Sequence, residues 1–65
     1  MMFKVKIAGK DRTKIFSDGF YTTMEAKDLA SAFAKAVSIA KTMEVIESEN
    51  NGTRRFWVES IEVLP

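Results

Sequence analysis

The sequence predicts an α+β domain in which one helix packs on one face of an antiparallel sheet of three to four strands, in the order β-β-α-β-β. One stretch, residues 28–43, has the apolar period of a long helix. The stretches on either side of it are short and alternate apolar with polar residues, as strands do. A length of 65 residues leaves room for one domain only, residues 1–65.

The helix is expected from Asp28 to about Met43. Its apolar stripe consists of Leu29, Ala32, Phe33, Ala36, Ala40 and Met43, with Ile39 at its edge. Asp28 is suited to cap the helix, because its carboxylate accepts a backbone N–H and complements the helix dipole. We expect Leu29, Phe33, Ala36 and Ala40 to be buried.

Two strands are expected before the helix. In the first, residues 3–7, Phe3, Val5 and Ile7 face the core and the alternating lysines face out. The second, Phe20 to Glu25, pairs with it, so that Phe20, Thr22 and Met24 face the helix while Tyr21 and Thr23 face away.

The segment between these strands has three interpretations. We favour one long basic loop over residues 9–19. Asp18-Gly19 is also a hairpin signal that would split residues 14–23 into two short strands. A bulge at Gly19 within a continuous strand is the third possibility.

After the helix, Asn51-Gly52 is the strongest turn signal in the chain. A hairpin around it would pair Glu49 with Arg54, Ile46 with Trp57 and Val45 with Val58, which is a consistent register. We prefer this hairpin, which ends the helix near Glu44. The alternative continues the helix to about Ser48 and leaves residues 49–53 as a loop.

The last strand, Arg54 to Leu64, does not alternate simply. Trp57, Ile61 and Val63 share one parity, whereas Phe56, Val58 and Leu64 share the other. Either both faces of the strand are partly covered, or a bulge near Glu59-Ser60 shifts the parity.

The composition argues against catalysis. The chain has no His and no Cys, the side chains on which most acid–base and nucleophilic mechanisms and zinc sites depend. The glutamates at 44, 47 and 49 are interpreted as a solvated acidic edge. We expect no enzyme activity, no cofactor, no metal, no small-molecule substrate and no membrane contact. The lack of Cys indicates an intracellular, cytoplasmic protein.

Protein binding is the leading functional expectation. A domain with one helix cannot bury all of its aromatic residues, so some remain for a partner. The candidate anchors are Phe16, Tyr21, Arg55 and Trp57. The partner is another protein or a second copy of the chain, with a homodimer as the expected oligomer. Self-association would use a strand edge or the small residues on the back of the helix, Ser31, Ala34 and Ser38.

Nucleic-acid binding is the alternative. Its candidate residues are Lys4, Lys6, Lys10, Arg12 and Lys14. Tyr21 is expected on the same open sheet face as Lys4 and Lys6, and a sheet that presents aromatic rings between cations is suited to single strands. The net charge of +1 is well below the basic balance typical of such domains.

Several local features resemble small single-domain proteins encoded by phages and other mobile elements. They are Ala26-x-Asp28 at the start of the helix with Ala32 and Ala36 following, the lysine-alternating first strand, and the closing Asn51-Gly52 hairpin. Some anti-CRISPR inhibitors have a similar β-β-α-β-β layout. The resemblance implies a compact protein that binds a host protein or nucleic-acid complex. The likeness to anti-CRISPR inhibitors implies that it also inhibits that complex. No residue's role carries over from it.

Overall fold

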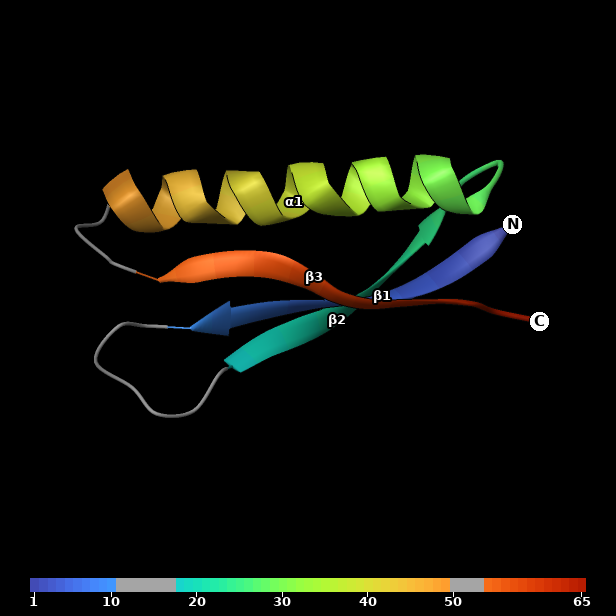
Figure 1. Cartoon of the computed structure of the whole chain (residues 1–65), viewed down its shortest axis with the longest axis horizontal. Helices are drawn as coiled ribbons and strands as arrows, with labels where there is room; N and C mark the ends of the chain where they lie inside the picture. Colours follow the sequence, from blue (N-terminus) through green and yellow to red (C-terminus); the bar gives the residue numbers. More distant parts are fainter. Residues whose placement is uncertain (11–17, 50–53) are drawn as a thin grey trace.

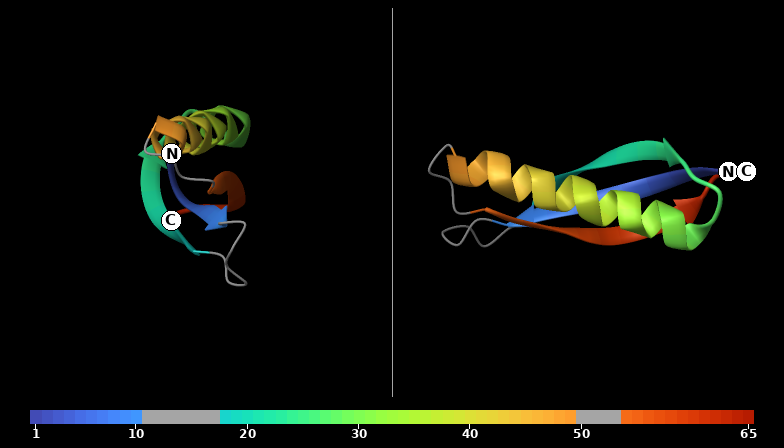
Figure 2. Two further views of the ribbon diagram at one scale, coloured as in Figure 1. Left: turned by 90° about the vertical axis from the view of Figure 1, so that its left-hand side faces the viewer. Right: turned by 90° about the horizontal axis from the view of Figure 1, so that it is seen from above.

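The computed structural model describes residues 1–10, 18–49 and 54–65. The elements follow in the order β1 (Met2–Lys10), β2 (Asp18–Glu25), α1 (Leu29–Glu49) and β3 (Arg55–Val63). β1 is the central strand, and β2 and β3 flank it antiparallel. α1 covers one face of this sheet, and both termini lie at one end (Figures 1 and 2). The expected α+β class is therefore confirmed, with three strands in the described part of the chain.

The core lies between β1 and three alanines of α1. Phe3, Val5 and Ile7 are almost completely buried, as expected, because β1 has a strand on each side and α1 above it. Ala32, Ala36 and Ala40 recur every four residues and are buried against this strand layer. Since alanine side chains are short, they let the helix backbone lie close to the sheet.

The expected burial of Leu29 and Phe33 is wrong. Their side chains are 59% and 52% exposed, whereas Ala36 and Ala40 are buried as predicted. α1 runs at an angle to the strands, and its N-terminal end lies at the outer side of β3 (Figure 2). The alanine row therefore takes the centre of the interface, and the larger side chains beside it project past the sheet.

The expected cap at the start of α1 is confirmed. The backbone N–H of Ser31 donates to Oδ1 of Asp28 at 2.8 Å, and this bond lowers the pKa of the Asp28 carboxyl below its ordinary value. The charged carboxylate is the better acceptor and complements the helix dipole.

The preferred hairpin between residues 45–49 and β3 is also wrong, because α1 continues to Glu49. The continuation of the helix to about Ser48 in the alternative is confirmed; Glu49 of its expected loop is helical, and residues 50–53 lie outside the described residues. Glu44 and Glu47 are three residues apart, so they lie on one side of the helix, near the start of β3. Oε1 of Glu44 accepts the N–H of Phe56 at 2.9 Å. Glu47 forms an ion pair with Arg54 at 3.5 Å. These tertiary contacts outweigh the small helix-propensity cost of Val45 and Ile46.

β3 pairs with β1 instead. Trp57 lies opposite Ala8, and Val58 lies opposite Ile7. This central-strand pairing gives β3 a ladder along its full length, which the shorter hairpin would not provide. The turn signal Asn51-Gly52 lies outside the described residues.

The favoured loop over residues 9–19 is too long. β1 runs through Lys10 and β2 begins at Asp18, with Gly19 opposite Ala8 and an uninterrupted register to Met2. Asp18-Gly19 is therefore neither a turn nor a bulge, and only residues 11–17, which lie outside the described part, remain between the strands. A Cβ at Gly19 would overlap the carbonyl oxygen of Ile7, so glycine is required there. The pairing of Phe20–Glu25 is confirmed.

The proposed bulge near Glu59-Ser60 is confirmed. Lys6 lies opposite Ser60 and Ile7 lies opposite Val58, so Glu59 is the extra residue in β3. The shift restores the apolar alternation: Phe56 and Val58 before the bulge and Ile61 after it pack on the helix side.

A substitution tests how closely the helix approaches the sheet. Ala36→Leu should lower the free energy of unfolding by about 1–3 kcal/mol, because the fully buried site has no room for three more carbons. Ala34→Leu, on an exposed part of the same helix, should change it by less than about 0.5 kcal/mol. Urea unfolding of both variants measures the difference. Equal stability of the two variants would contradict the described core.

Candidate functional site

The face of the sheet away from α1, called the open face below, carries a cluster around Tyr21. The ammonium groups of Lys4 and Lys6 lie 4.7 Å and 5.6 Å from the centroid of the Tyr21 ring. Tyr21 is directly opposite Lys6 in the β1–β2 register and is 61% exposed. The expectation that Tyr21 shares a face with the two lysines is confirmed.

Glu59, the bulge residue, reaches into this cluster. Its Oε2 lies 3.0 Å from Nζ of Lys6. The hydrogen bond to Glu59, together with its negative charge, raises the pKa of Lys6 above the ordinary lysine value. Glu62 of β3 is the residue opposite Lys4. Lys6 is thus paired with a carboxylate, and Lys4 has one opposite it in the β1–β3 ladder.

The remaining candidate residues divide between the open face and the undescribed part of the chain. Arg55 and Trp57 pair with Lys10 and Ala8, so alternation places them on the open face with Tyr21. Trp57 is 41% exposed, while its neighbour Ala8 is buried. Three of the four candidate protein anchors therefore share one face. Phe16, Arg12 and Lys14 lie outside the described residues.

A second surface was missed in the sequence analysis. It is an apolar groove between α1 and the outer side of β3, called the α1–β3 groove below. A hollow of about 680 Å³ forms its main part and is lined by Leu29, Ala30, Phe33, Val58, Glu59, Ser60 and Ile61. A second hollow of about 350 Å³, lined in part by Phe33, Val37, Phe56 and Val58, continues it toward the end of α1.

The sequence contained a signal for this groove. Leu29, Phe33 and Val37 recur every four residues. They form a row on the helix beside the row of Ala32, Ala36 and Ala40. Only one of two adjacent helix rows can lie over the centre of a narrow sheet, and the smaller row permits the closer approach. The larger row is then left at the margin, as the structure shows.

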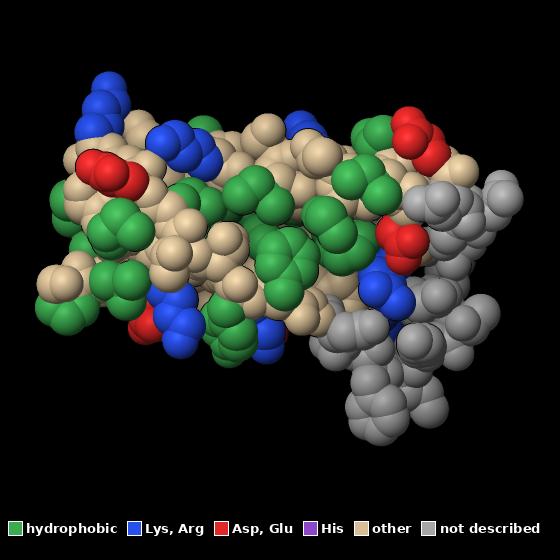
Figure 3. All heavy atoms as spheres, turned by 180° about the vertical axis from the view of Figure 1, so that it is seen from behind, with side chains coloured by type: hydrophobic (Ala, Val, Ile, Leu, Met, Phe, Trp, Pro, Cys, Tyr) green, Lys and Arg blue, Asp and Glu red, His purple; other side chains and the backbone are tan. Residues whose placement is uncertain are grey.

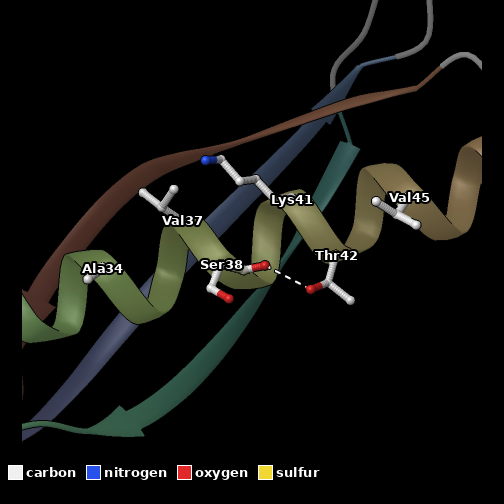
Figure 4. A pocket seen from close by; sticks show the side chains of 6 residues that line it. All are labelled: Ala34, Val37, Ser38, Lys41, Thr42 and Val45. Carbon is white, nitrogen blue, oxygen red and sulfur yellow. Dashed lines mark hydrogen bonds between the residues drawn. The ribbon is translucent and has the colours of Figure 1, made fainter.

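Two other surfaces are less distinctive. On the side of β2, apolar side chains follow the length of the molecule between α1 and the sheet (Figure 3). Phe20, Met24, Ile39 and Met43 are partly buried there against the core. On the outward side of α1, Ala34, Ser38, Thr42 and their neighbours line a shallow depression that belongs to one helix only (Figure 4). The hydroxyl of Thr42 donates to the carbonyl of Ser38 at 2.9 Å within it.

Within residues 1–10, 18–49 and 54–65, three or more acidic side chains do not gather into a potential metal site. In the same residues, α1 does not combine the length and the apolar character that a membrane-crossing helix needs. No family model, curated protein or solved structure matches the chain. The resemblance to phage-encoded inhibitors therefore stays a prediction.

Removing the carboxylate of Glu59 tests the electrostatics of the open face. Glu59→Gln should lower the pKa of Lys6 toward the ordinary value of 10.5, because it removes the main cause of the upward shift. Glu62→Gln is the matched control and should leave Lys6 nearly unchanged. NMR titration of the lysine side-chain signals gives both values. An unchanged Lys6 in Glu59→Gln would show that the two side chains do not interact in solution.

Proposed function

We propose that this protein is a small binding module that acts through protein–protein contacts and not through catalysis. The observation that carries the proposal is the α1–β3 groove, where Leu29 and Phe33 are more than half exposed beside Val58 and Ile61. A contiguous apolar surface on a small soluble fold is typical of a protein interaction site. The aromatic and arginine side chains of the open face provide a second surface with the residue types of binding hot spots.

The charges of the open face favour a protein partner over nucleic acid. Lys4 and Lys6 lie over the ring of Tyr21, so they cover a surface on which a base would have to stack. Lys6 is also bound by Glu59, and Lys4 faces Glu62 across the β1–β3 ladder. Carboxylates at these positions repel phosphate groups. Regulation or inhibition of a larger protein complex is the role that we propose for such a module.

Site-specific photo-crosslinking tests the proposal. The photoreactive residue p-benzoylphenylalanine is placed at Phe33, in the groove, and in a matched control at Ser38, on the outward side of α1. In the cells that make the protein, illumination should give a protease-sensitive adduct from position 33 and little from position 38. Absence of an adduct at position 33, or equal labelling from both positions, would contradict binding through the groove.

Binding of single-stranded nucleic acid is the second candidate, and the Lys4–Lys6–Tyr21 cluster is the observation that favours it. If it is correct, Glu59→Gln should tighten binding to a mixed-sequence oligonucleotide, because it frees the charge of Lys6. Affinity should also fall by about 10³-fold between 50 and 200 mM salt if several phosphates are contacted. Fluorescence anisotropy measures both effects. Absence of binding by the wild type and by Glu59→Gln would eliminate this candidate.

A further inference from the structure

We propose that the α1–β3 groove binds a second copy of this chain, with the β3 strands of the two copies side by side and antiparallel around a two-fold axis. This inference rests on the proposed protein-binding function and names the partner at the groove. Three features support it: the outer edge of β3, which no other strand of the described residues pairs with, the charge pattern along that strand, and the position of α1 over the edge.

The outer edge of β3 is available for pairing over its C-terminal half. The N–H of Phe56 points away from β1, because it donates to Glu44 of α1. The N–H of Leu64 points toward β1, because it donates to the carbonyl of Met2. Alternation then directs the backbone groups of Ile61 and Val63 outward, as it does those of Val58 before the bulge. Glu44 thus occupies the edge at Phe56, and from Val58 onward the edge has no strand partner among residues 1–10, 18–49 and 54–65.

One alignment uses these free groups well. A two-fold axis between Glu59 and Ser60 places Val58 of each copy opposite Ile61 of the other. Both residues pack on the helix side and both direct backbone groups outward, so the pairing keeps the apolar faces of the two sheets on the same side. In the same alignment Phe56 lies opposite Val63, and the N–H of Phe56 already donates to Glu44, so the new ladder is limited to the two Val58–Ile61 pairs.

The charges of β3 complement themselves in this arrangement. The strand begins with Arg55 and carries Glu59 and Glu62 in its second half. Antiparallel strands therefore bring Arg55 of each copy near Glu62 of the other, at a diagonal position that long side chains can bridge.

In this arrangement the second copy would cover the apolar side chains that α1 leaves exposed. The N-terminal end of α1 lies at the outer side of β3 (Figure 2). A second β3 strand at this edge would lie beneath Leu29 and Phe33, which are exposed in the single copy. Each copy thus supplies both the exposed side chains and the hollow that receives them, as a two-fold interface requires.

Charge reversal on β3 tests this interface. Sedimentation equilibrium of the wild type at micromolar concentrations should show a monomer–dimer equilibrium. Arg55→Glu and Glu62→Arg should each raise the dimer dissociation constant by about tenfold or more. In each variant, side chains of like charge occupy positions 55 and 62 at both symmetry-related contacts. The double variant Arg55→Glu/Glu62→Arg should return the constant to within about threefold of the wild type, because the opposite charges meet again.

Control variants separate this result from a loss of folding. Glu49→Arg makes the same charge change at an exposed position on α1 and should leave the dimer unchanged. Phe33→Glu should abolish the dimer without lowering the thermal midpoint of the monomer, because the side chain is exposed there. Circular dichroism verifies that each variant is folded.

Two outcomes would overturn the inference. One is a chain that stays monomeric at millimolar concentration, and the other is a dimer that the charge reversals do not affect. A monomer that still gives a protein adduct from position 33 would leave the proposed function standing and replace the second copy with another partner. A monomer without any adduct from that position would contradict both proposals.

Discussion

The structure depends on the close approach of α1 to the sheet. Ala32, Ala36 and Ala40 face Phe3, Val5 and Ile7, and these six residues form most of the buried core. Large side chains on the sheet and small side chains on the helix are complementary, since two rows of large residues would separate the layers. Most other features follow from this division, including the exposure of the larger helix row and the amount of apolar surface at the margins.

The two edges of the sheet differ in their contacts with α1 and in the apolar surface that they leave exposed. On the β3 side, Glu44 and Glu47 tie the end of α1 to the start of the strand, and the overlying helix leaves an apolar groove beyond it. On the β2 side, Lys35 Nζ donates to the carbonyl of Glu25 at 2.7 Å, and the apolar side chains are partly buried. Partner contacts are therefore expected on one side of the helix more than on the other.

Much of the fold was predictable because it depends on local patterns. The alternation of Phe3, Val5 and Ile7 with lysines, the cap at Asp28 and the parity break at Glu59 each identified a feature that the structure contains. The end of α1 was not predictable in this way, because it depends on tertiary contacts: Glu44 bonds to Phe56, 12 positions further on, and Glu47 pairs with Arg54 just before β3. The groove was missed because helix periodicity defines a stripe but not which of its rows lies over the sheet.

The three alanines also affect the conformational entropy of the molecule. Alanine has no side-chain rotamers to lose, so the helical half of the core becomes ordered with little side-chain entropy loss. Leu29 and Phe33 are exposed and keep most of their rotamer freedom in the single copy. Folding therefore does not bear the entropy loss of ordering these two side chains. In the association that we propose, that loss would fall on binding, so folding and association would depend on different side chains of the same helix.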